Sequence, residues 1–65
     1  MKVNEFDVVE LVDGRIGTVL DIYETPTLGY GVDIYYGEEG PPEDDDGYEV
    51  LEAHEIILVI DAYNG

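Results

Sequence analysis

The chain has 65 residues and no cysteine, and its 17 acidic side chains are accompanied by only two basic ones, which gives a net charge of -15. A chain of this length builds one small domain, and the missing cysteines exclude disulfides and the usual cysteine-based zinc sites. Because phosphate contacts need Lys or Arg, the charge argues against direct binding to nucleic acid or to an anionic membrane. Hydrophobic residues make up 45% of the chain, which predicts a folded core rather than a disordered acidic tail.

The first third of the chain carries two strand signals around a tight turn. Residues Phe6 to Val12 are rich in β-branched side chains, which favour a strand. Asp13-Gly14 follows, a dipeptide that tolerates positive φ and is typical of a hairpin turn. Residues Ile16 to Tyr23 predict the second strand. The segment from Thr25 to Gly29 predicts a loop, because its proline cannot donate to a sheet ladder.

Residues Tyr30 to Tyr36 predict a third strand in which apolar and polar side chains alternate. Because successive side chains of a strand point to opposite faces, we expect Val32 and Ile34 inside. Asp33 and Tyr35 are expected on the outside. The pattern therefore predicts a strand with one face in the core and the other in water.

A polar loop and a fourth strand are expected next. Residues 37–46, called the acidic loop below, consist mainly of Gly, Pro, Glu and Asp and predict a mobile polar loop. Gly47 to Leu51 predicts the fourth strand. Tyr48 and Val50 are expected on one face of that strand.

The end of the sequence is open to two interpretations. Glu52 to Glu55 suits a single 3₁₀ turn, and the run from Ile56 to Ile60 then predicts a fifth strand. The alternative is a helix over residues 51–62, because Leu, Glu, Ala and His all tolerate helix. The β-branched run favours the strand, since such side chains lose χ1 freedom in a helix.

A short stretch resembles the turn and strand of KOW domains and related SH3-like barrels. It comprises Gly14 to Val19, with glycines at the turn and apolar residues facing the core, followed by Asp21 and Ile22. The 3₁₀ turn before a final strand is also SH3-like. The resemblance implies an all-β fold, a small five-stranded SH3-like barrel with one 3₁₀ turn before the last strand, as a single domain over residues 1–65. KOW domains often bind RNA, or ribosomal and transcription proteins, through basic loops, whereas the loops here are acidic, so that role is not carried over.

Six carboxylates of the acidic loop are the predicted partner-binding residues. Because an extended chain advances ~3.3 Å per residue, acids on one face would imitate the charge spacing of a DNA strand. Such a surface would bind the groove, lined with Lys and Arg, of a protein that handles nucleic acid. The alternative is a solvated loop with no partner. The predicted residues are Glu38, Glu39, Glu43, Asp44, Asp45 and Asp46, with Tyr35 and Tyr36 beside them.

The rest of the chain is also acidic, and no Lys or Arg follows Arg15. Solubility alone needs a net charge of about 2 to 8 in a small domain. The charge of -15 exceeds that range and lowers stability through self-repulsion. A binding function accounts for the excess better than solubility does.

Metal binding and catalysis have little support in the sequence. Asp44 to Asp46 are consecutive and directly precede Gly47, whereas a calcium loop spaces its carboxylates at alternate positions. The chain has no Ser and no Cys, and its single His54 has no nucleophile beside it, which is typical of a structural turn residue. We therefore expect no metal, no cofactor and no enzymatic activity.

The aromatic residues are divided between the core and the surface. Tyr is enriched at binding hot spots because it buries a large area at low entropy cost. Exposed Tyr among acids would contact Arg-rich surfaces through cation–π interactions, although Tyr also simply suits strands. The expected core residues are Phe6, Tyr23 and Tyr48, and the expected partly exposed residues are Tyr30, Tyr35, Tyr36 and Tyr63.

The leading hypothesis is a small inhibitor that occupies the nucleic-acid groove of a basic protein such as a nuclease. In charge pattern the chain resembles the DNA-mimic proteins of phages and mobile elements, which include many anti-CRISPR proteins. The alternatives are an immunity or antitoxin-type protein that neutralises a basic toxin, an SH3-like module of a larger complex, and a halophilic adaptation of an ordinary domain. The sequence has no cysteine and no apolar leader at its start, so we expect a cytoplasmic protein, monomeric because of its charge.

Overall fold

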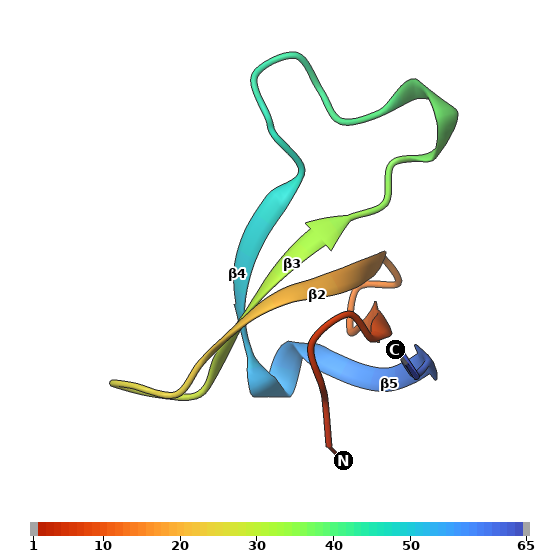
Figure 1. The fold of residues 1–65 in the computed structure, drawn as a ribbon. Coiled ribbons are helices and arrows are strands. Elements are labelled where there is room, and N and C mark those ends of the chain that lie inside the picture. The colour runs from red at the N-terminus through yellow and green to blue at the C-terminus, as the bar shows by residue number, and fades with distance from the viewer. Residues whose placement is uncertain (1, 65) are drawn as a thin grey trace.

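The computed structural model describes residues 2–64, which form five β-strands and two short 3₁₀ helices (Figure 1). No helix within these residues has the length and apolar character needed to cross a bilayer. The prediction of an all-β chain is confirmed. The strands are β1 (Val8–Leu11), β2 (Ile16–Tyr23), β3 (Gly29–Ile34), β4 (Tyr48–Glu52) and β5 (Ile56–Asp61), and the 3₁₀ helices are η1 (Gly37–Glu39) and η2 (Ala53–Glu55).

All five strands belong to one antiparallel sheet with the order β4-β3-β2-β1-β5. The edge strands β4 and β5 are joined by η2, which has only three residues (Figure 1). In a flat sheet the two edges would lie about 19 Å apart, at ~4.8 Å for each strand spacing. A 3₁₀ helix rises only about 2 Å per residue, so the sheet must curl to bring its two edges together at this end.

Register shifts in the strand pairs contribute to this curl. In the pair of β2 with β3 the shift falls between Val19 and Asp21, and β1 pairs with β5 through two further shifts. An extra residue in one strand bends that strand and increases its twist. We therefore place the bend of β2 at Leu20.

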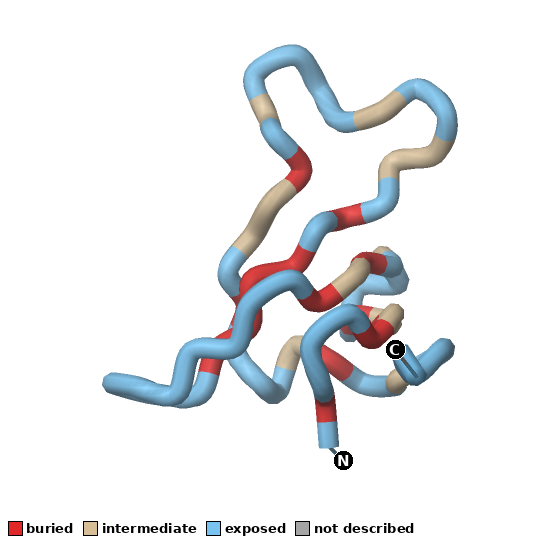
Figure 2. Tube along the Cα trace, viewed as in Figure 1, coloured by how far each residue is buried: buried red, intermediate tan, exposed pale blue. Residues whose placement is uncertain are grey.

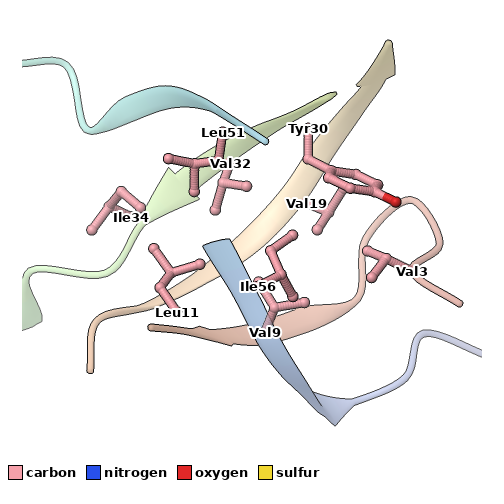
Figure 3. Packing of buried hydrophobic residues seen from close by; sticks show 9 residues of the cluster. All are labelled: Val3, Val9, Leu11, Val19, Tyr30, Val32, Ile34, Leu51 and Ile56. Atoms are coloured by element: carbon pink, nitrogen blue, oxygen red, sulfur yellow. The ribbon is translucent and has the colours of Figure 1, made fainter. Parts of the chain in front are cut away.

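The core fills the inner face of the curled sheet. Every strand contributes to it, and Val9, Val19 and Val32 are fully buried. β-branched side chains suit these positions because they pack well on a pleated surface. Figure 2 shows that most of the loops are exposed, as are most of β5 and the second half of β2. The nine core residues, drawn in Figure 3, are Val3, Val9, Leu11, Val19, Tyr30, Val32, Ile34, Leu51 and Ile56.

Most of the predicted elements are confirmed, with ends that shift by a few residues. The bounds of β2 are those expected, Val32 and Ile34 are buried, and Asp33 and Tyr35 are exposed. The 3₁₀ turn and β5 also follow one another as predicted. The alternative of a helix over residues 51–62 is therefore wrong.

The prediction of which aromatic residues form the core is wrong. Phe6 and Tyr23 are exposed and Tyr48 is half-buried, whereas Tyr30 is 6% exposed and belongs to the core. The inward positions of β3 are the even-numbered ones, as Val32 shows, so Tyr30 points inward (Figure 3). Tyr23 and Tyr48 lie on the outer face of the sheet, where their hydroxyls reach each other.

Asp7 ties the two ends of the chain together. It is the only buried acid within residues 2–64, at 1% exposed. Its Oδ2 accepts a hydrogen bond of 2.8 Å from the Asn4 backbone N–H, and its Oδ1 accepts one of 2.9 Å from the Tyr63 N–H. The rings of Phe6 and Tyr63 meet edge to face beside it, with centroids 5.2 Å apart. The carboxylate therefore replaces the sheet partners that both terminal segments lack.

Candidate protein-binding surface

The acidic loop projects from the sheet between β3 and β4, at the top of Figure 1. It begins with η1 and turns again where the Asp45 N–H donates a hydrogen bond of 3.0 Å to the Pro42 carbonyl. Gly37 and Gly40 have φ angles of 78° and 72°, which residues other than glycine rarely adopt. The loop is therefore a series of turns, and the expectation that its acids line an extended chain is wrong.

Two of the six predicted carboxylates hold the loop in shape. Asp45 accepts hydrogen bonds from the Gly47 N–H at 2.8 Å and from the Tyr36 hydroxyl at 3.3 Å. Asp46 accepts one of 2.9 Å from the Tyr48 N–H. Side chains of Asp commonly bond the backbone two residues on and thereby fix a turn. These two acids position the loop where it returns to β4.

The other four predicted carboxylates lie on the surface of the acidic loop. Glu38, Glu39, Glu43 and Asp44 are all exposed, the first two on η1 and the others in the turn that follows. The acidic loop thus presents a group of charges at its tip and uses the remaining two at its base.

The two tyrosines predicted beside the acidic loop have different environments. Tyr35 is 70% exposed and is available for contact. Tyr36 is half-buried and packs against the core, and its hydroxyl donates to Asp45. Partial burial and the neighbouring Asp45 charge raise the pKa of Tyr36, because both disfavour the phenolate. Tyr36 therefore supports the loop, and of these two tyrosines Tyr35 is the exposed one.

The few basic residues do not offset the negative surface. Arg15 forms ion pairs with Asp13, at 2.7 Å, and with Glu49. The hydrogen bond from Arg15 to Glu49 is the largest cause that raises the pKa of Arg15 above its usual value, and the hydrogen bond to Asp13 is the second. The Arg15 charge is thus compensated within the protein, and Lys2 is the only other Lys or Arg in the chain.

A hydrogen-bonded chain of two tyrosines and an aspartate crosses the outer face of β2, β3 and β4. The Tyr48 hydroxyl donates to Asp21 Oδ2 at 2.8 Å, and the Tyr23 hydroxyl lies 2.7 Å from the Tyr48 hydroxyl. Since Tyr48 has only one hydroxyl proton, Tyr23 must be the donor to Tyr48. A Cβ at Gly31 would overlap the Tyr48 ring, so glycine is needed where the ring lies across β3. Sequence reasoning missed this group, because Tyr23 and Tyr48 meet only through the strand register.

We expect Tyr48 to ionise only above its ordinary pKa of 10.0. The hydrogen bond with Tyr23 is the largest cause, followed by the one to Asp21, and both favour the neutral hydroxyl. Because the folded-state pKa is raised, the stability that Tyr48 contributes is complete below pH 10.0 and is lost as the pH rises through the raised value. The pH at which half of Tyr48 is ionised can be measured from tyrosinate absorbance. The absorbance of Tyr48→Phe is subtracted from that of the native protein at each pH, and the midpoint of the difference is the pKa of Tyr48.

Tyr23→Phe is the matched variant for that titration. Removing the Tyr23 hydroxyl should bring the midpoint of Tyr48 down towards 10.0, because the largest cause of the shift is lost. A midpoint at 10.0 in the native protein would contradict the hydrogen-bonded arrangement.

The His, Asp and Glu side chains of the described residues do not gather into a metal site. Within residues 2–64, no three His, Asp or Glu side chains lie close enough to hold a metal ion. His54 is exposed on η2, with Nδ1 3.2 Å from Oε2 of Glu52. The arrangement is that of a turn residue beside an acid.

Exposed carboxylates, an exposed tyrosine and a net charge of -15 give this surface a strongly negative character. A comparison of the chain with protein-family models, curated proteins and solved structures finds no match. Function is therefore inferred from the surface itself.

Proposed function

We propose that the protein binds a basic protein that handles nucleic acid, such as a nuclease, and inhibits it by occupying its DNA- or RNA-binding groove. In this role the carboxylates stand in for phosphates and pair with the Lys and Arg of the groove. Such an inhibitor needs no catalytic residue and no cofactor. It acts as a monomer in the cytoplasm, where its target meets nucleic acid.

One observation carries the proposal. Asp7 is the only buried acid within residues 2–64, and the other acids are exposed or half-buried on every strand and in the acidic loop. Ordinary surfaces mix both signs of charge, whereas here the Arg15 guanidinium is bound by Asp13 and Glu49. A field of one sign attracts a macromolecule of the opposite sign and raises its association rate.

We also propose that the curled sheet is an SH3-like barrel. The order β4-β3-β2-β1-β5 and the three-residue η2 between the two edge strands support this assignment. A rigid barrel would hold the acidic loop away from the core. The partner would then meet a surface whose shape is set before binding.

The proposal is tested by capture from a nuclease-treated cell lysate on the immobilised protein. Capture is carried out at about 50 mM and about 500 mM salt, since ion pairing weakens as the Debye length falls. Captured proteins are identified by mass spectrometry and then challenged with duplex DNA and single-stranded RNA. We expect a basic nucleic-acid-binding protein that is retained at low salt, lost at high salt and released by nucleic acid.

Three results would contradict the proposal. One is capture that is equally strong at both salt concentrations. Another is a captured protein that nucleic acid does not release. The third is a basic toxin with no affinity for nucleic acid, which would instead favour an immunity protein.

A further inference from the structure

The outer face of the sheet has a pocket at the end opposite the acidic loop. The register sets Gly29 of β3 between Tyr23 of β2 and Glu52 of β4 on this face. Because Gly29 has no side chain, the backbone of β3 is the floor and the side chains of β2 and β4 are the walls. The loop between β2 and β3, yellow at the left of Figure 1, closes the end of the pocket. The volume is about 490 Å³, which lies in the range of ligand sites.

The walls of the pocket are mainly apolar. Tyr23 and Val50 line it from the strands, and Pro26 and Leu28 line it from the loop. A tyrosine ring and a proline ring suit the stacking of a planar group. The long methylene stem of a basic side chain also packs well against such walls.

The Tyr23 wall is held in place before any ligand arrives. Its hydroxyl donates to Tyr48, and Tyr48 donates to Asp21, so the side chain cannot swing to another χ1 rotamer without breaking this chain. Ligands bind more tightly to walls that need no ordering. The chain of hydroxyls thus has a role in shaping the pocket.

The charge beside the pocket is negative. Glu52 lines the pocket and forms a capping box with Glu55, in which the Glu55 backbone N–H donates to the Glu52 side chain. In the other half of the box the Glu52 N–H donates to Glu55 Oε2 at 2.8 Å. Glu24 follows Tyr23 directly and is exposed. No Lys or Arg is among the residues that line the pocket. An anionic ligand is therefore disfavoured.

We propose that this pocket receives an arginine side chain of the basic partner, with the guanidinium stacked on Tyr23 and paired with Glu52. A planar guanidinium uses both features of the site, because it stacks on aromatic faces and bonds a carboxylate through two N–H groups. A lysine ammonium uses only the charge. This inference rests on the proposed function, since the partner supplies the arginine. It adds an anchor with defined shape to a surface that otherwise attracts by charge.

The direct test uses N-acetyl-arginine methylamide as the probe and the amide chemical shifts of the ¹⁵N-labelled full chain as the readout. We expect saturable shifts at Gly29, Val50 and Leu51 that exceed those in the acidic loop. The citrulline analogue, which has the same shape and no charge, should leave these amides unchanged. The lysine analogue should bind more weakly than the arginine analogue.

Three outcomes of the titration would overturn the inference. The first is arginine shifts that do not saturate or that are largest in the acidic loop. The second is equal binding of the citrulline analogue, which would show that charge is not recognised. The third is equal binding of the lysine analogue, which would exclude guanidinium stacking.

A matched pair of leucine variants locates the site. Leu28→Ala removes a pocket wall, and Leu58→Ala removes a leucine of similar exposure, 50% against 45%, from β5. We expect Leu28→Ala to weaken arginine binding about fivefold, through the apolar contact that it removes. Leu58→Ala should bind as the native protein does. Equal affinities of the two variants would overturn the placement.

Gly29→Ala offers a second variant that keeps the walls intact. A Cβ at this position has room, with its nearest neighbour, the Leu51 carbonyl oxygen, 3.4 Å away. The added methyl group would occupy the floor of the pocket and should reduce arginine binding without loss of the fold. Unchanged arginine binding in a folded Gly29→Ala variant would count against the pocket.

The failure of this inference is distinguishable from that of the proposed function. Leu28→Ala and Gly29→Ala leave the net charge unchanged. If both variants capture the basic partner at full strength, and nucleic acid still releases it, the pocket has no role and the proposed function stands. If the native protein captures no such partner but arginine still saturates the pocket, the proposed function fails and the pocket stands as a guanidinium site.

Discussion

Replacing Asp7 by alanine is expected to lower the free energy of unfolding by about 3 kcal/mol, since each hydrogen bond to a charged group contributes about 1.5 kcal/mol or more. The substitution removes the acceptor for two backbone N–H groups, those of Asn4 and Tyr63. Because Asp7 is 1% exposed, the substitution also leaves a cavity at a buried position. In a domain of this size, 3 kcal/mol is a large part of a total that starts at about 5 kcal/mol. Urea unfolding followed by tyrosine fluorescence measures the loss.

Asp33→Ala is the control for the Asp7 substitution. Asp33 is an exposed acid of β3, so its removal changes the charge equally and leaves the termini attached. We expect it to alter stability by less than about 0.5 kcal/mol, as surface substitutions usually do. Equal stability of Asp7→Ala and the native protein would show that the two ends of the chain do not depend on this carboxylate.

Neutralising the tip of the acidic loop should weaken partner binding about 30-fold at low salt. The variant carries Glu38→Gln, Glu39→Gln, Glu43→Gln and Asp44→Asn, and it keeps Asp45 and Asp46, which hold the loop in shape. Four exposed ion pairs at about 0.5 kcal/mol each total about 2 kcal/mol, which corresponds to roughly 30-fold. The dissociation constant for the captured partner, measured by calorimetry, gives the change. The slope of affinity against salt should fall as well, because fewer ion pairs form.

A second variant with the same change in net charge separates the loop from the general field. It replaces Glu5, Glu24, Asp33 and Asp61 by the corresponding amides, all at exposed positions outside the acidic loop. We expect it to weaken binding by less than the loop variant, because these acids act mainly through the long-range field. Equal losses of partner affinity in the two variants would show that the acids of the loop contribute no more to binding than exposed acids elsewhere on the surface.

The strands could be predicted because local patterns determine them. In β2 and β5, β-branched residues run between turn signals, and in β3 the alternation of Val32, Asp33 and Ile34 defines the buried face. The 3₁₀ turn of η2 comes from residues that tolerate helix and are followed directly by the β-branched run of β5, which favours a strand and ends the turn. Local propensity and tertiary structure agree in these elements.

The contacts that depend on register could not be predicted. Tyr23 and Tyr48 lie 25 residues apart in the sequence, and the bond between Asp7 and Tyr63 spans 56 residues. The side of the sheet on which Tyr23 lies depends on a register shift near Leu20 that no residue type indicates. A shift of one residue moves a side chain to the other face. For the same reason the pocket beside Gly29 was not predicted.

The acidic residues were found from the sequence, but their separate roles were not. Nothing in the sequence distinguishes Asp45 and Asp46 from Asp44. In the structure, however, the carboxylates of Asp45 and Asp46 accept hydrogen bonds from the backbone N–H groups that lead into β4. Tyr36 likewise had the same appearance as Tyr35 until its hydroxyl was placed against Asp45. A charge pattern indicates a surface, and only the geometry separates the charges that a partner can reach from those that build the loop.

Competition for the captured partner tests the central claim most directly. The partner is bound to labelled duplex DNA, or to RNA if RNA is its ligand, and the present protein is added while free and bound nucleic acid are measured. We predict complete displacement with one-to-one stoichiometry and no complex that contains all three components, because a single groove cannot hold both ligands. A stable ternary complex, with nucleic acid and the acidic protein bound at once, would contradict the account.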